Sequence, residues 1–295
     1  MAKAKASAPV EENESTDLVV AGTDGAVVSA APSFMAKGDA GKENIGTKDV
    51  EIPWLKLLQG TSPGIHENGW RAGNFLHSVL EEEVPGADGM LITVITALTP
   101  RYMLFNPLEQ GGGILARAED GIHWNPPNHS FDVKVNKGVT PVTWTTKPTV
   151  AASGLDKWGT YDPNNPNSPP AADLQYRYIC VSPSHPEFGA FMILMQRSAI
   201  AAAKRLNSYL RASEVDSFGL VFRIRSKWED KGPDDKKFLW TVSRAGFVAS
   251  QDAYEKNREV YETFKDMDIG MHQEEQSASA DTGSDAAPDD KNSEY

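Results

Sequence analysis

Cationic and aromatic side chains are interleaved in five separate segments of the chain, at 101–105, 117–124, 176–178, 223–228 and 236–240. Proteins that bind single-stranded nucleic acid use this combination, because cations contact phosphates while aromatic rings stack on bases at about 1–3 kcal/mol per base. For each aromatic residue taken singly, packing in a β core is the favoured alternative. The interpretation therefore depends on the set as a whole.

The sequence predicts a nucleic-acid-binding set drawn from these segments and from one helix face. It comprises Arg101, Tyr102, Phe105, Arg117, Trp124, Arg197, Lys204, Arg205, Arg211, Arg223, Arg225, Lys227, Trp228 and Lys237. No helix motif that reads a DNA groove accompanies these residues. We therefore expect single strands to be preferred over duplex, with little sequence preference.

The patterns that signal catalysis or metal binding are missing. The three glycines at 111–113 lack the Gly-Lys-Ser/Thr end of a phosphate-binding loop. The six histidines form no pair at the spacing of metal ligands on a helix, and the acidic run at 81–83 is typical of a solvated face. Because no serine or cysteine nucleophile signature is present, the sequence predicts a binding protein without catalytic residues, metal or cofactor.

The two ends of the chain carry most of its charge. The N-terminal arm (residues 1–44) has a net charge of −3 and the acidic tail (residues 271–295) one of −6, which leaves −3 of the total −12 for residues 45–270. Both ends lack apolar periodicity, so we expect them to be disordered. The acidity of the whole chain therefore does not argue against an anionic ligand for the core.

The acidic tail has three alternative roles. It would compete with DNA for a basic groove of its own core, dock on a basic partner such as a polymerase or recombination protein, or serve only to increase solubility. Tethering at short range gives an effective concentration on the order of millimolar, so competition needs little intrinsic affinity. Truncation after Gly270 is then expected to tighten DNA binding at low salt.

The elements that would position these residues are short strands separated by turn signals, followed by helices late in the chain. Apolar alternation predicts strands near 91–98, 174–181 and 190–195, and a final hairpin from 220–227 and 238–243. Helices are expected at 196–212 and 250–267. Because helices between the early strands are missing, the pattern favours a mainly β fold with α additions over a βαβ sheet.

We expect this fold to be an OB-like Greek-key barrel with long inserted loops, one late amphipathic helix and a C-terminal helix. In the helix at 196–212, Ala199, Ala203, Leu206 and Leu210 share one face and the cations lie on the opposite one. Cys180 lies in an alternating apolar run, which predicts a buried thiol. No stretch reaches the roughly 18 apolar residues that cross a bilayer, so we expect a soluble protein.

Three stretches of the core carry a resemblance to a known family. They are 45–59 with Ser62 and Pro63, 109–117 with 123–127, and 196–199. Together they resemble a family of tailed-bacteriophage proteins associated with phage single-stranded DNA-binding proteins. The acidic tail that ends in Tyr295 is similar to the acidic, aromatic-ended tails of such proteins.

This resemblance implies a role in phage DNA replication or recombination, in the cytoplasm of an infected host cell, with single-stranded DNA and phage replication proteins as partners. The alternative is a virion or assembly component that acts through protein contacts. The sequence leaves open whether the protein forms a homo-oligomer.

Overall fold

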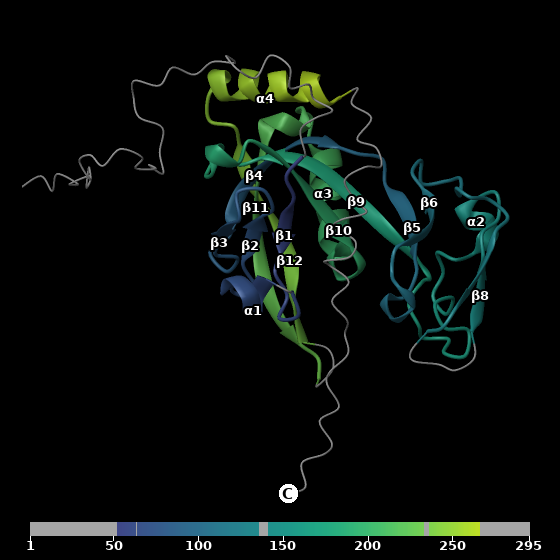
Figure 1. Cartoon of the computed structure of the whole chain (residues 1–295). Coiled ribbons are helices and arrows are strands. Elements are labelled where there is room, and N and C mark those ends of the chain that lie inside the picture. The colour runs from purple at the N-terminus through teal and green to yellow at the C-terminus, as the bar shows by residue number, and fades with distance from the viewer. Residues whose placement is uncertain (1–51, 63, 136–140, 233–235, 266–295) are drawn as a thin grey trace, which may run out of the picture. The chain divides into compact units, whose positions relative to one another are not determined.

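The computed structural model describes residues 52–62, 64–135, 141–232 and 236–265 (Figure 1). The N-terminal arm and the acidic tail lie outside the described residues. The described part falls within the expected core at 45–270.

The largest sheet has seven antiparallel strands in the order β12-β11-β4-β9-β5-β6, and β10 pairs with β9 off this path. The strands are β4 (Met90–Ala97), β5 (Arg101–Phe105), β6 (Ile114–Ala118), β9 (Ala172–Val181), β10 (Ala190–Gln196), β11 (Leu220–Asp230) and β12 (Lys236–Phe247). Strand β9 joins the parts of the sheet, because its first half pairs with β5 while its second half pairs with β4.

Two smaller sheets and several short helices complete the described part. The strands β1 (Leu55–Leu57), β2 (Phe75–His77) and β3 (Glu82–Val84) form one sheet, and β7 (Ser130–Val133) and β8 (Val142–Thr145) form the other. The α-helices are α1 (Gly64–Asn68), α2 (Val150–Ser153), α3 (Ile200–Ala212) and α4 (Gln251–Phe264). The 3-10 turns are η1 (Leu108–Gln110), η2 (Pro186–Phe188), η3 (Arg197–Ala199) and η4 (Ser217–Gly219).

The two faces of the central strands pack against different elements. On one face, Phe222 and Ile224 of β11 join Ala203 and Leu206 of α3 and Phe75 of β2 in the largest core cluster. On the other face, apolar residues of β4, β9 and β10 pack against Tyr254, Val260, Tyr261 and Phe264 of α4. A separate cluster joins β5 and β6 to β7, β8 and α2.

The late helices confirm the sequence expectation, with one difference. Helix α4 begins after Ser250, whose side chain accepts a hydrogen bond from the backbone N–H of Ala253 and so caps the helix. Helix α3 begins at Ile200 and not at 196, because β10 extends through Gln196 and Arg197 adopts a φ of +49°. The predicted apolar face of α3 is confirmed by the burial of Ala203 and Leu206.

The mainly β character and the final hairpin are confirmed as well, but the described strands form no closed barrel. Strands β12 and β6 stand at opposite ends of the strand order and do not pair with each other. The OB-like barrel is therefore not confirmed. Strands β1, β2 and β3 have three residues each and are too short for apolar alternation to show in the sequence.

The buried thiol is confirmed. Cys180 is fully buried in β9, and burial raises the pKa of its thiol. No helix in the described part of the chain is long and apolar enough to cross a membrane.

Candidate nucleic-acid interface

Strands β11 and β12 form the longest hairpin of the described chain, paired from Leu220 with Phe247 to Asp230 with Lys236 (Figure 1). Strand β4 pairs with β11 only at residues 222–224. Beyond that point the hairpin continues as a two-stranded ribbon. Its two strands carry six cations and two acids, in a chain whose net charge is −12.

Side-chain alternation gives the hairpin an inner and an outer face. The inner face carries Ile224, Val242 and Trp240, and Trp240 stacks on Phe75 of β2 with ring centroids 4.9 Å apart. The outer face carries Arg223, Arg225 and Lys227, opposite Ser243, Thr241 and Leu239 of β12. Because the apolar residues turn inward, the cations are left on the side away from the core.

We call Arg223, Arg225 and Lys227 the basic ribbon face. Arg225 and Lys227 are exposed and Arg223 is half-buried. None of the three makes an ion pair among the described residues, and the Arg225 Nε donates only a long hydrogen bond of 3.5 Å to the Asp88 carbonyl. Alternate residues of a strand are roughly 7 Å apart, so the three cations form a row along the ribbon.

The tip of the hairpin differs from this row because its cations are paired. Lys231 Nζ lies 2.9 Å from Glu229 Oε2, and Lys236 Nζ lies 3.4 Å from Asp230 Oδ2. Lys237 is half-buried and stands opposite Glu229 in the register. Within the described part of the hairpin, the cations that have no carboxylate partner therefore lie along the ribbon.

Exposed aromatic rings stand near both ends of the hairpin. Trp228 is 49% exposed and packs with one side against Phe238 at a centroid distance of 4.9 Å. Phe247 is 58% exposed and lies under the guanidinium of Arg244 at 4.6 Å. In the register Trp228 lies opposite Phe238 and Phe247 opposite Leu220, so both rings are on the inner side of the hairpin and not on the side of Arg223, Arg225 and Lys227. Arg244 and Phe247 are absent from the set predicted from the sequence. The sequence signal for them is a cation three residues before an aromatic residue at the end of a strand.

The cations of α3 form a second, separate group. Lys204, Arg205 and Arg211 are exposed, opposite the buried Ala203 and Leu206. Tyr209 of the same helix stacks on Phe222, at 6.2 Å between ring centroids, so α3 packs on the inner side of the hairpin.

Arg197 is not part of the α3 face. It precedes the helix in η3, and its Nη2 lies 2.8 Å from Asp173 Oδ2 of β9. This ion pair ties the start of α3 to the sheet.

Arg101 belongs to a buried polar network. It is 1% exposed; its Nη1 lies 3.2 Å from both carboxylate oxygens of Glu119, and its Nε donates to Gln175 Oε1 at 2.8 Å. Arg177 Nη2 lies 3.5 Å from the same carboxylate. Arg101 therefore holds β5, β9 and the end of β6 together and is not accessible to a ligand.

The remaining members of the predicted set lie in and around the cluster formed by β5 to β8. Trp124 is buried and its Nε1 donates to Ser153 Oγ at 3.1 Å. Phe105, Arg117 and Tyr102 are half-buried. Burial, aided by the negative charge of Asp156, raises the pKa of the Tyr102 hydroxyl. These residues do not join the basic ribbon face.

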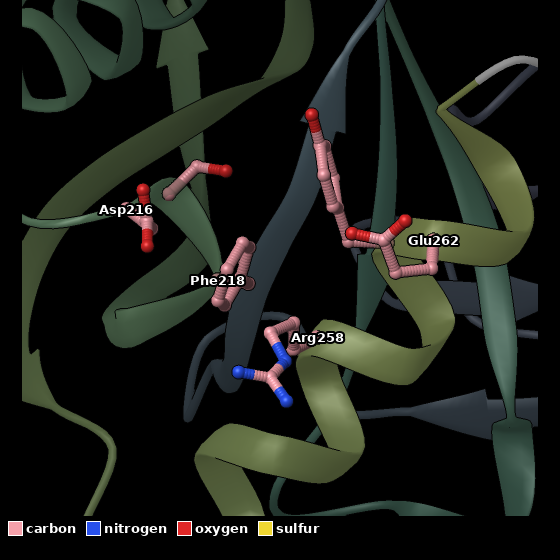
Figure 2. Close-up of a pocket in the computed structure, with 6 residues that line it drawn as sticks. Asp216, Phe218, Arg258 and Glu262 are labelled. Carbon is pink, nitrogen blue, oxygen red and sulfur yellow. The ribbon is translucent and has the colours of Figure 1, made fainter.

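A hollow of about 340 Å³ lies between η4 and α4, lined by Asp216, Ser217, Phe218, Arg258, Tyr261 and Glu262 (Figure 2). Its polar groups are already engaged. Arg258 pairs with Glu255 at 2.7 Å, and the Tyr254 hydroxyl donates to Asp216 Oδ2 at 2.7 Å. With two carboxylates and one paired guanidinium, this hollow does not suit a polyanion.

Comparison with known proteins identifies the family. A search of curated proteins and a search of solved structures gave no match. The sequence model of one bacteriophage family, the Pam3 phage gp34-like proteins, matches residues 23–269. This match covers most of the chain and confirms the expectation of a phage protein. The chain belongs to the Pam3 phage gp34-like protein family.

Proposed function

We propose that this phage protein binds single-stranded DNA without catalysis, in phage DNA replication or recombination, and that the basic ribbon face contacts the phosphates. The observation that carries the proposal is the row of three cations that have no carboxylate partner among the described residues, on a positively charged hairpin of an acidic chain. A row of cations matches the line of phosphates that a single strand offers.

A two-stranded β-ribbon is also able to enter the major groove of duplex DNA, so duplex is the competing substrate that the test includes. The inner face of the hairpin is covered. Phe75 stacks on Trp240, and the side-chain amide of Gln59 bonds both the backbone N–H and the carbonyl of Phe238, at 2.9 and 3.0 Å. We therefore infer that the strand lies across the outer face.

The cations of α3, Lys204, Arg205 and Arg211, are a second area for phosphate contact on the other side of the hairpin. The acidic tail would compete with DNA for these cations, as the sequence predicts. Neither role is needed for the basic ribbon face to bind a strand.

A second candidate function is favoured by a different observation. Trp158 is 72% exposed and Ile122 is 55% exposed, in the region of the β5–β8 cluster. Exposed large apolar side chains that form a contiguous patch are typical of surfaces that contact other proteins. A virion or assembly component that acts through protein contacts would use them.

The test of the proposal uses the full-length protein and fluorescent oligonucleotides. Fluorescence anisotropy compares one sequence as a single strand and as a duplex, from about 50 to 200 mM salt. The single strand is expected to bind more tightly, with a log–log salt slope of about −2, because each of three phosphate contacts contributes about −0.7. Affinity should then fall about 15- to 20-fold over this range. Equal affinity for duplex, or binding of neither, would contradict the proposal, and the latter would favour the assembly role.

A further inference from the structure

Two carboxylates and one imidazole lie together at a place that the DNA-binding proposal does not use. Glu82 of β3, His185 and Glu187 each offer one ligand atom, and these atoms all lie within 4.8 Å of one another. We propose that Glu82, His185 and Glu187 form a binding site for a divalent transition-metal ion of the Zn²⁺ type. Imidazole and carboxylate groups are common protein ligands for such ions.

His185 and Glu187 are already placed as neighbouring ligands of one ion. The His185 Nδ1 and the Glu187 Oε1 are 3.0 Å apart. Metal–ligand bonds of about 2.0–2.2 Å put two ligands of the same ion roughly 3–3.5 Å apart. Glu82 is exposed, so its carboxylate has room to move toward the other two ligands. Three protein ligands leave at least one position for water.

The backbone around the imidazole is held in place. The His185 N–H donates to Ser182 Oγ at 3.1 Å, and the His185 ring stacks on Phe188, with centroids 4.9 Å apart and planes inclined by 19°. Phe188 is buried and packs with its ring against His77. A ligand whose ring is fixed in this way loses little side-chain entropy on binding.

The other ligand is held by the small sheet. Glu82 pairs with His77 across β2 and β3, and Val84, two residues further on, is buried opposite Phe75. The site therefore links β3 to the η2 turn, two segments far apart in the sequence. A bound ion is expected to stabilise the folded state by bridging them.

An ordinary ion pair with His185 explains only one of the two carboxylates in this cluster. An imidazole needs one carboxylate partner, and two carboxylates held near each other repel unless a cation lies between them. The chain offers a matched comparison in His123, whose Nδ1 lies 2.6 Å from Asp120 Oδ2. The His123 and Asp120 side chains are 66% and 52% exposed, and no second carboxylate belongs to this pair among the metal-ligand clusters of the described residues.

The test measures Zn²⁺ affinity of the full-length protein by competition with a chromophoric chelator, and uses Co²⁺ absorption as a spectroscopic probe. We expect the substitution His185→Ala to weaken Zn²⁺ binding by at least about 100-fold. Loss of a group that only supports a ligand costs up to about 100-fold in metal affinity, and loss of a direct ligand should cost no less. Glu82→Gln, at an exposed position that leaves the fold intact, should also weaken it. The control His123→Ala should bind as wild type does.

Two outcomes overturn the site. One is unchanged Zn²⁺ affinity in both His185→Ala and Glu82→Gln. The other is an equal loss in His123→Ala, which would show that the ion is held by scattered surface groups. Circular dichroism of each variant separates loss of a ligand from loss of the fold. DNA binding is not a readout, so the result is independent of the proposed function.

Discussion

Reversing the charge of Arg225 and Lys227 to glutamate should reduce the affinity for single-stranded DNA by about 100-fold at low salt. Each lost contact between a cation and a phosphate removes about 1.5–3 kcal/mol at most, and the new carboxylates repel the strand. The salt slope should fall from about −2 to about −0.7, because only Arg223 would remain. Fluorescence anisotropy over a salt series measures both quantities.

The matched control reverses Lys147 and Lys157, two exposed cations outside the hairpin, which changes the net charge by the same amount. Both pairs of side chains are exposed, so the melting curves should stay close to wild type, within about 0.5 kcal/mol for each position. Wild-type affinity in the ribbon variant would move the interface to Lys204, Arg205 and Arg211 of α3. An equal loss in the control would show that only net charge matters.

Replacing Glu119 with glutamine should lower the free energy of unfolding by about 2–3 kcal/mol. The carboxylate serves two buried guanidinium groups, those of Arg101 and Arg177, whose side chains are 2% and 7% exposed. Breaking a buried ion pair from one side costs about 3–5 kcal/mol, and the partial exposure of Glu119 reduces this cost. Urea denaturation followed by tryptophan fluorescence measures the change.

The control for this prediction is Glu229→Gln. Glu229 pairs with Lys231, which is largely exposed, and exposed pairs contribute about 0–1 kcal/mol. We expect its unfolding curve to overlap with that of wild type. A Glu119→Gln protein as stable as this control would mean that the two arginines are satisfied without the carboxylate.

Local sequence patterns predicted the elements whose structure depends mainly on residues within the element itself. The alternation from Leu220 onward predicted both the β11–β12 hairpin and the outward cations, because every second residue of a half-buried strand faces solvent. The helix expected over 250–267 was found to start after Ser250, whose cap depends only on residues within one turn. The burial of Cys180 could also be predicted locally, because its neighbours at alternate positions of the strand are apolar.

Features that depend on distant partners could not be predicted in this way. Arg101 alternates with aromatic residues as a surface cation would, yet Glu119 and Gln175 from other segments enclose it. Closure of a barrel depends on whether β12 meets β6, a pairing that no local pattern encodes. The cluster of Glu82, His185 and Glu187 likewise appears only when β3 and η2 are brought together.

Ultraviolet crosslinking of the full-length protein to an oligothymidine strand, followed by peptide mapping with mass spectrometry, tests the central claim most directly. The predicted result is crosslinked peptides from β11 of the hairpin, the strand that holds Arg223, Arg225 and Lys227, with yields that fall as salt rises. Crosslinks confined to other segments, such as the one around Trp158, or none at all, would contradict binding through the basic ribbon face.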